Sequence, residues 1–234
     1  MSVVHPAVAV FDAYGTLFDV HSAVARLADA IGPKAPQVSA LWRQKQLEYS
    51  WTYALMRHYV DFWQLTQEAL DYALASVGQN DPRVRVQLLD AYRTLDAYQE
   101  VASVLDDYRR AGLRVAVFSN ATPAMLDHAL DAAQLRDRVD AVFSVHALAC
   151  YKPDPRVYDA AAEAFGVAAE AIAFHSSNAW DAAGAAATGW RTRWINRSGV
   201  PAEYPSLVVP AVRDLAQARL AFLGHDQPGE AIAR

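Results

Sequence analysis

Short runs of apolar residues alternate with amphipathic stretches along most of the chain. Residues 7–11, Ala-Val-Ala-Val-Phe, form a β-branched run that predicts a fully buried strand. The same pattern recurs at 113–118 and 171–174, and weaker runs predict strands at 140–143, 190–195 and 207–209. Amphipathic spacing predicts helices at 98–111, 123–133, 155–165, 179–188 and 211–222. Strands that alternate with helices indicate an α/β fold with a parallel sheet.

Residues 20–96 break this alternation. The stretch shows no convincing strand pattern, and its helical spacing is interrupted by Pro33, Pro36, Gly78 and Pro82. It is rich in Trp and Tyr, most of which we expect to form the core of a small helical bundle. We therefore predict a helical module inserted after the first strand.

The composition narrows the possible classes of protein. With 234 residues, 53% of them hydrophobic, the chain can bury a substantial core. Its formal net charge of −5 offers no electrostatic footprint for nucleic acid or an anionic membrane. No apolar run approaches the roughly 20 residues of a membrane helix, and the first residues lack a signal-type leader. Cys150 is the only cysteine, so no intrachain disulfide can form. We expect a soluble cytoplasmic protein.

Chemically active side chains follow several of the predicted strands. Asp12-Ala13-Tyr14-Gly15-Thr16-Leu17 follows the first strand, and Ser119-Asn120-Ala121-Thr122 follows the strand at 113–118. Tyr151-Lys152-Pro153-Asp154 precedes a helix, and the strand at 171–174 leads into residues 175–181, His-Ser-Ser-Asn-Ala-Trp-Asp. Ligands of open α/β sheets bind at the carboxyl ends of the strands. We therefore expect a nucleophile, hydroxyl and amide donors, a cation and a second carboxylate to converge at one edge of the sheet.

This order of Asp, Ser, Lys and an Asp-bearing loop resembles the haloacid dehalogenase superfamily over essentially the whole chain. The resemblance implies a Rossmann-like parallel sheet core with an inserted helical cap domain. It predicts a discontinuous core of residues 1–17 and 97–224, a cap of residues 18–96 and a tail of residues 225–234. Cap residues would complete the site, so the fit between cap and core would affect the rate.

Two positions depart from the phosphatases that make up most of this superfamily. Tyr14 and Ser177 stand where those phosphatases carry carboxylates that support Mg²⁺, and the first of these also serves as a general acid. A phosphate monoester carries up to two negative charges, so an Asp nucleophile needs a metal and a leaving-group acid. A 2-haloacid has one charge remote from the reacting carbon, and halide leaves without a proton. The double replacement therefore favours dehalogenation.

The closest resemblance is to the type II L-2-haloacid dehalogenases. It rests on Phe-Asp-Ala-Tyr-Gly-Thr-Leu-Phe-Asp-Val at the first strand, residues 42–49, Tyr151-Lys152-Pro153 and residues 176–181. It implies hydrolysis of short L-2-haloacids to 2-hydroxy acids with inversion, through an ester on Asp12 that water then hydrolyses. It implies no metal and no other cofactor, with the haloacid and the halide ion as the bound small molecules, and it suggests a homodimer.

The resemblance assigns a role to the groups around the nucleophile. Asp12 would attack the substrate, although an isolated Asp at this place could simply form a turn or a helix cap. Lys152 would neutralise and orient Asp12, rather than lie exposed on a loop. Thr16 would hydrogen-bond Asp12 or its loop. Ser176, Asn178 and Asp181 would position or polarise the hydrolytic water, and Tyr158 would support them. A salt bridge from Asp181 to Lys152 would compete with a role for Asp181 as general base.

Further residues would bind the halide and the substrate. Arg43, Asn120 and Trp180 would cradle the leaving halide, although Arg43 could be a surface residue of the bundle and Trp180 a core residue. Ser119, with backbone N–H groups near Tyr14 and Gly15, would hold the substrate carboxylate, and Ser119 could also cap the next helix. The pocket walls would be Tyr14, Gln44, Leu47 and Phe62, of which Leu47 and Phe62 could serve packing alone.

His175 departs from its relatives, which look apolar at this position. It could donate a hydrogen bond beside the carboxylate or narrow the pocket. A lone His is more often a satisfied core residue, and we predict a modest importance for it.

Two other functions remain open on the sequence. One is a Mg²⁺-dependent phosphatase of the same superfamily, against which the missing carboxylates at 14 and 177 argue. The other is a non-catalytic member that binds a ligand or a protein. A scaffold would not need Asp12, Lys152, Ser119 and Asp181 together, so their presence argues against it.

Overall fold

A six-stranded, fully parallel sheet forms the centre of the molecule in this computed structural model, which describes residues 5–224. The strand order is β3-β2-β1-β4-β5-β6. The strands are β1 (Val8–Phe11), β2 (Arg114–Ser119), β3 (Ala141–Ser144), β4 (Ile172–Ser176), β5 (Arg191–Ile195) and β6 (Ala211–Val212). Phe11 pairs with Val117 on one side and His175 on the other. The carboxyl ends of β1, β2 and β4 are therefore aligned, and the loops that follow them start at the same edge.

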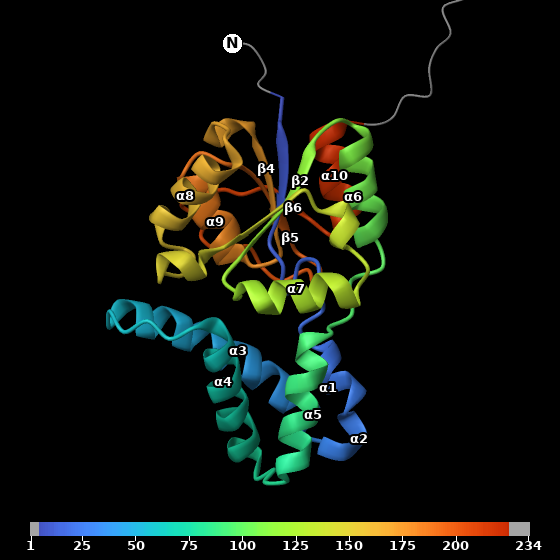
Figure 1. Cartoon of the computed structure of the whole chain (residues 1–234), viewed down its shortest axis with the longest axis vertical. Coiled ribbons are helices and arrows are strands. Elements are labelled where there is room, and N and C mark those ends of the chain that lie inside the picture. The colour runs from blue at the N-terminus through green and yellow to red at the C-terminus, as the bar shows by residue number, and fades with distance from the viewer. Residues whose placement is uncertain (1–4, 225–234) are drawn as a thin grey trace, which may run out of the picture.

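Helices cover both faces of the sheet, as Figure 1 shows. Helices α6 (Val101–Arg110) and α10 (Leu215–Leu223) lie on one face, and α8 (Pro155–Phe165) and α9 (Ala179–Ala187) lie on the other. Helix α7 (Pro123–Ala132) follows β2 and lies toward the carboxyl edge. Because both faces are covered, β1 is buried along its whole length, which explains its continuous apolar sequence.

The stretch that breaks the alternation forms five helices below the carboxyl edge of the sheet (Figure 1). They are α1 (Ser22–Arg26), α2 (Ala28–Ile31), α3 (Ala35–Leu55), α4 (Phe62–Val77) and α5 (Pro82–Arg93). Local signals fix their ends: the Asp61 side chain accepts hydrogen bonds from the first turn of α4, and Gly78 ends that helix in the left-handed conformation. Asp81 and Pro82 begin α5 in the same manner.

The chain passes between the sheet and these helices at two neighbouring segments. The Asp19 N–H donates to the Asp96 carbonyl at 2.8 Å, and the Tyr98 N–H donates to the Leu17 carbonyl at 3.0 Å. A single hydrophobic cluster extends from β1 through Leu17 and Phe18 into the helices. The two parts of the molecule therefore share one core at the crossing.

The predictions of the last strand and the start of the last helix were wrong. Residues 207–209 do not form a strand, and Val208 is 87% exposed. Strand β6 begins at Ala211, four residues after the predicted start, beside Trp194. An apolar run forms a strand only where a neighbour offers an edge, and here β5 offers its edge to residues 211–212. The helix predicted from residue 211 consequently starts at Leu215, where the Asp214 side chain accepts from the Gln217 N–H. The predicted tail of residues 225–234 lies outside the described residues.

Within residues 5–224, no helix combines the length and the apolar character needed to cross a membrane.

Candidate active site

Asp12 lies directly after β1, and its carboxylate is held by three side chains. One oxygen accepts a hydrogen bond from Lys152 Nζ at 3.2 Å. The other accepts from Thr16 Oγ1 and from Asn178 Nδ2, each at 2.9 Å. The Asp12 N–H donates to the His175 carbonyl at 2.9 Å, which continues the sheet pairing and fixes the backbone. With 6% of its surface exposed, Asp12 is an oriented carboxylate that a small ligand can still approach.

Lys152 is completely buried and saturates its ammonium group inside the protein. Besides Asp12, Nζ donates to the Phe118 carbonyl at 2.8 Å and to Asp181 Oδ2 at 2.9 Å. The Lys152 N–H donates to Asn120 Oδ1 at 3.0 Å, so the residue after β2 fixes the backbone that carries the cation. An ammonium group has three donors and all three are used, which makes Lys152 a fixed positive charge between two carboxylates.

Asp181 lies in the first turn of α9 and is also completely buried. Its carboxylate accepts from Lys152, from the Tyr158 hydroxyl at 2.8 Å and from Ser176 Oγ at 3.0 Å. Burial raises the pKa of Asp181 to about 6, and the charge of Asp12 acts in the same direction, while Lys152 opposes both. The ion pair with Lys152 that would compete with a role as general base is therefore present. A carboxyl group with a pKa of about 6 can nevertheless exchange a proton near neutral pH.

The loops after β1 and β4 are locked together by Thr16. Its hydroxyl donates to Asp12 and accepts from the Ser177 N–H at 2.8 Å. Gly15 has a φ of +94°, and a Cβ atom there would lie 3.0 Å from Ser177 Oγ. Only glycine combines this conformation with this close approach. The Gly15 N–H donates to the Phe18 carbonyl at 2.7 Å within the turn. This corrects the prediction that it would hold a substrate carboxylate, since the tight turn has already engaged it.

Arg43 reaches the site from α3. Its Nη2 donates to the Tyr14 carbonyl at 3.0 Å and to Asn178 Oδ1 at 3.2 Å, while Nη1 donates to Gln46 Oε1 at 2.8 Å. Asn178 therefore connects the guanidinium to Asp12 through the two ends of one amide. This places a second fixed positive charge close to the carboxylate, on the side of the inserted helices.

A family model for haloacid dehalogenase-like hydrolases matches residues 6–189. The chain belongs to this family. The match includes every residue around Asp12 described above.

Named relatives and solved structures agree with this assignment. The (S)-2-haloacid dehalogenase 4A of Burkholderia cepacia is 50% identical over 196 residues, which cover 83% of this chain and 85% of the relative. The (S)-2-haloacid dehalogenase of Pseudomonas sp. strain YL is 48% identical over 81% of this chain and 82% of its own. The structure of a dehalogenase with an intermediate complex superposes with a TM-score of 0.92, at 44% identity, and covers 96% of this chain and 100% of that one.

A further structure contains a covalently bound ligand. It is the L-2-haloacid dehalogenase of Xanthobacter autotrophicus with chloropropionic acid covalently bound, which has a TM-score of 0.83 at 35% identity. The alignment covers 92% of this chain and 98% of that one.

The residues that the sequence indicated for this haloacid dehalogenase-like site fall into two groups. Those joined by hydrogen bonds around Asp12 are Thr16, Arg43, Asn120, Lys152, Tyr158, Ser176, Asn178 and Asp181, together with the Tyr14 carbonyl. The others lie outside these hydrogen bonds. Ser119 is buried at the end of β2, where its hydroxyl accepts from the Ala121 N–H at 3.2 Å. Leu47 is half-buried and Gln44 is exposed.

His175 lies on the opposite face of the sheet from this network. Its ring is stacked on Phe11 at 4.4 Å, and its Nε2 and Nδ1 lie 2.7 Å from the Tyr108 hydroxyl and 3.0 Å from the Val10 carbonyl. These contacts match the alternative of a satisfied core histidine and not that of a residue that narrows the pocket. Burial lowers the pKa of His175 to about 3, so the ring is neutral.

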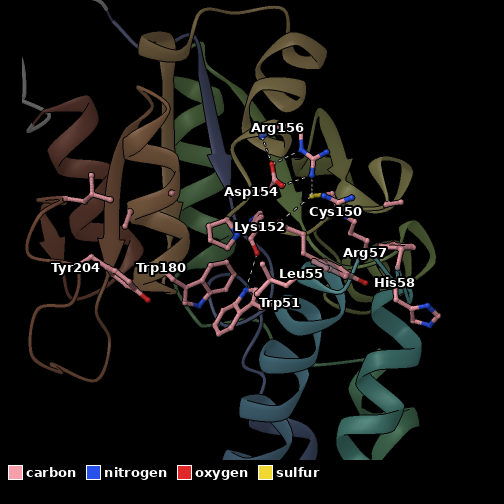
Figure 2. Close-up of a pocket in the computed structure, with 18 residues that line it drawn as sticks. Trp51, Leu55, Arg57, His58, Cys150, Lys152, Asp154, Arg156, Trp180 and Tyr204 are labelled. Atoms are coloured by element: carbon pink, nitrogen blue, oxygen red, sulfur yellow. Dashed lines mark hydrogen bonds and ion pairs between the residues drawn. The ribbon is translucent and has the colours of Figure 1, made fainter.

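A cavity of about 1070 Å³ lies beside the Lys152 loop, and its lining residues are drawn in Figure 2. Lys152 and Trp180 belong to the lining, whereas Asp12 does not. The sequence did not single out Trp51, whose indole N–H donates to the Lys152 carbonyl at 3.2 Å and whose ring meets Trp180 edge-on at 5.3 Å. Lys152 thus both lines this cavity and contacts Asp12.

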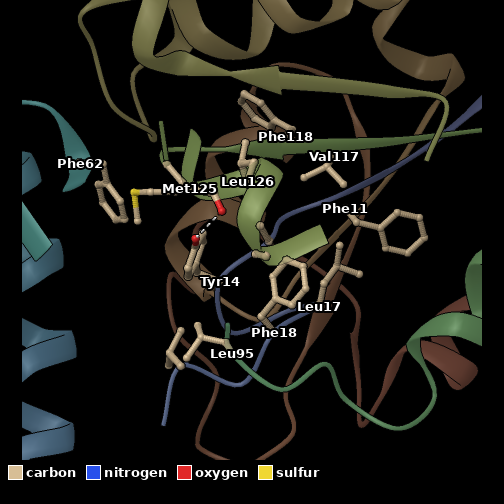
Figure 3. Packing of buried hydrophobic residues seen from close by; sticks show 14 of the residues in the cluster. Phe11, Tyr14, Leu17, Phe18, Phe62, Leu95, Val117, Phe118, Met125 and Leu126 are labelled. Carbon is tan, nitrogen blue, oxygen red and sulfur yellow. Dashed lines mark hydrogen bonds between the residues drawn. The ribbon is translucent and has the colours of Figure 1, made fainter. Parts of the chain in front are cut away.

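Tyr14 closes the site on the side of α7. Its ring is buried, and its hydroxyl donates to the Met125 carbonyl at 3.5 Å, as Figure 3 shows. Phe62 is buried in the same hydrophobic cluster. Burial raises the pKa of Tyr14 well above its usual value, so the phenol remains neutral. Tyr14 therefore presents an apolar, uncharged ring where the phosphatases of the superfamily carry a carboxylate.

Gln46 is the second residue that the sequence analysis missed. It is 1% exposed and accepts from Arg43. A signal was present, because residues i and i+3 of a helix lie on one face, and Gln46 follows Arg43 by three positions.

Proposed function

We propose that the chain is an (S)-2-haloacid dehalogenase, which hydrolyses the carbon–halogen bond of short L-2-haloacids and yields 2-hydroxy acids of inverted configuration. The observation that carries the proposal is the Asp12 carboxylate, which is oriented by Lys152, Thr16 and Asn178 at the carboxyl edge of the sheet. The names of the relatives that cover more than four fifths of the chain support the same reaction.

In the first step, one oxygen of Asp12 attacks carbon 2 of the substrate from behind the halogen. The new carbon–oxygen bond forms as the carbon–halogen bond breaks, and the electron pair leaves with the halide. Arg43 stabilises the negative charge that develops on the halogen, with Asn120 and Trp180 as further partners. No proton is needed at this stage, which suits a site where position 14 is a neutral tyrosine.

In the second step, water attacks the acyl carbon of the Asp12 ester. The bond between that carbon and the ester oxygen breaks, so the product carries an oxygen atom from Asp12. Asp181, with Ser176 and Tyr158 bound to its carboxylate, takes a proton from the attacking water and gives it to the departing alkoxide oxygen. The Asp12 carboxylic acid then releases its own proton to solvent. Lys152 stabilises the negative charge on the tetrahedral intermediate, because its ammonium group already contacts Asp12.

Ser119 and the backbone N–H of Tyr14 hold the substrate carboxylate. The substrate pocket is lined by Tyr14, Gln44, Leu47 and Phe62. Residues 18–96 act as a cap over a core of residues 1–17 and 97–224. The enzyme works in the cytoplasm as a homodimer and needs no metal or other cofactor.

The test is chloride release from (S)-2-chloropropionate in the presence of excess chelator. In ¹⁸O-labelled water, the first turnover should give unlabelled hydroxy acid, because that oxygen comes from Asp12; Asp12→Asn should release no chloride. Phosphatase activity that depends on added Mg²⁺, without chloride release, would favour the phosphatase alternative. The absence of both activities would favour a non-catalytic member of the family.

A further inference from the structure

The guanidinium of Arg43 is hydrogen-bonded to the buried side-chain amide of Gln46. Its Nη1 donates to Gln46 Oε1 at 2.8 Å, and Gln46 is 1% exposed. A guanidinium on a flexible side chain has many rotamers of similar energy, so a buried acceptor at a fixed place selects one of them. The hydrogen bonds to the Tyr14 carbonyl and to Asn178 then fix the other end of the group.

The orientation of the Gln46 amide is itself determined by its neighbours. Nε2 donates to Thr66 Oγ1 at 2.7 Å and to the Tyr92 hydroxyl at 2.9 Å. The Thr66 hydroxyl donates to the Phe62 carbonyl at 2.6 Å, so it is an acceptor for Gln46. Both amide hydrogens are used on this side, and the amide oxygen accepts from Arg43 at 2.8 Å and from the Tyr92 hydroxyl at 3.2 Å. The network thus specifies which atom the guanidinium meets.

Tyr92 links the same network to the loop that carries the nucleophile. Its ring stacks on Tyr14 with centroids 5.5 Å apart and an interplanar angle of 9°. The Tyr14 carbonyl is also an acceptor for Arg43. Helices α3, α4 and α5 therefore contribute one buried group each, Gln46, Thr66 and Tyr92, to a support that ends at the Asp12 loop.

We propose that Gln46 is a positioning residue that fixes the guanidinium of Arg43 where negative charge develops on the leaving halide. The inference rests on the proposed dehalogenase function. Electrostatic stabilisation of a transition state depends on donors that are already in place, and a displacement of about 1 Å can cost about a hundredfold in rate. Loss of Gln46 should therefore affect the step in which the carbon–halogen bond breaks.

The dependence on the leaving group separates positioning from a general structural defect. Chloride is a poorer leaving group than bromide, so its departure relies more on stabilisation by Arg43. In Gln46→Met, the single-turnover rate of ester formation should fall about tenfold to a hundredfold with 2-chloropropionate, and by a clearly smaller factor with 2-bromopropionate. Ser50→Ala is the matched control, because Ser50 is a buried residue one turn later on α3 and donates only to the Leu47 carbonyl. It should change neither rate.

A double mutant tests whether the effect of Gln46→Met acts through Arg43. In Arg43→Lys, addition of Gln46→Met should cost little more, since the guanidinium that it positions is gone. Should Gln46→Met unfold, Thr66→Val undergoes the same measurements, because it removes the hydroxyl that accepts from Gln46 Nε2 at 2.7 Å. Equal losses with chloride and bromide, or an undiminished loss in the Arg43→Lys background, would overturn the proposal while leaving the proposed function intact. A wild-type protein that releases neither halide would instead overturn the proposed function.

Discussion

Lys152 and Asp181 form an ion pair, 2.9 Å between Nζ and Oδ2, in which neither side chain is exposed. Lys152 also contacts Asp12 at 3.2 Å, so one cation lies between two carboxylates. Burial of charges is costly unless they are paired and hydrogen-bonded. The arrangement gives Asp181 a pKa of about 6, high enough for proton exchange near neutral pH.

The protonation of Asp181 should determine how the rate of ester hydrolysis falls at low pH, which is the acid limb of the pH–rate profile. Below a pH of about 6 the carboxyl group is protonated, so it can no longer accept a proton from the hydrolytic water. We expect the rate of ester hydrolysis to fall roughly tenfold for each pH unit below 6. Single-turnover decay of the ester, followed from pH 4.5 to 8, measures this limb. A rate that stays constant between pH 5 and 7 would remove Asp181 as the base.

Tyr158→Phe should move that limb to higher pH. The Tyr158 hydroxyl donates to Asp181 Oδ1 at 2.8 Å and so favours the ionised carboxylate. Its removal raises the pKa of Asp181, and the acid limb should shift upward by about half to one pH unit. The rate on the alkaline side should change less than the position of the limb. A limb that stays in place, with a uniformly lower rate, would make Tyr158 a packing residue.

His175 should matter for stability in acid and not for turnover. Its folded-state pKa of about 3 lies below the value of about 6.5 in an unfolded chain. The unfolded chain therefore binds the extra proton, and the contribution to stability is complete above pH 6.5 and is lost as the pH falls toward 3. His175→Val should weaken this acid dependence, measured as the unfolding free energy between pH 4 and 7.

The same variant should lower stability at neutral pH by about 1–3 kcal/mol, because it leaves the buried Tyr108 hydroxyl without the partner it has now. Adding Tyr108→Phe should recover part of the loss. A change in halogen preference in His175→Val would contradict the placement of the ring away from the pocket.

Continuously apolar strands that alternate with helices, and the edge that parallel strands share, carried most of the prediction. The runs at 7–11, 113–118 and 171–174 lie within one or two residues of β1, β2 and β4, because a strand covered on both faces reads as continuously apolar. The convergence of Asp12, Lys152 and Asp181 was expected because ligands of parallel sheets bind at the carboxyl ends of the strands, and the family resemblance implied the same. The placement of His175 could have been predicted from the sequence, because successive side chains of a strand point to opposite faces of the sheet. Ser176 contacts Asp181, so its neighbour His175 points to the other face.

Other features depend on contacts that no local pattern contains. Residues 207–209 have strand-like composition, but β5 pairs with residues 211–212 instead. A glutamine such as Gln46 normally reads as a solvated helix position, and only the packing of α4 and α5 against α3 makes it a buried acceptor for Arg43. The inserted helices were recognisable as a unit, whereas their polar network was not.

Arg197 connects the two segments where the chain passes between the sheet and the inserted helices. Its Nη2 donates to the Thr16 carbonyl at 3.0 Å, its Nη1 donates to Glu100 at 2.6 Å, and its guanidinium lies over the Tyr98 ring at 3.8 Å. Thr16 in turn holds the Asp12 carboxylate. Arg197→Met should therefore lower kcat more than it raises KM, with a loss of stability of about 1–3 kcal/mol, measured by steady-state kinetics and thermal unfolding.

Arg26→Met is the matched control for Arg197→Met. Arg26 pairs with Asp96 at the same crossing, but side chains that are 37% and 63% exposed make this a solvent-screened pair. Such pairs contribute about 0–1 kcal/mol, so the control should keep its turnover and almost all of its stability. If both variants lose stability and kcat equally, the crossing responds to any lost charge pair. The hydrogen bonds of Arg26 go to Thr94 and Asp96, and neither belongs to the Asp12 loop. If only Arg197→Met lowers kcat, the contact with the Thr16 carbonyl therefore transmits the effect to Asp12.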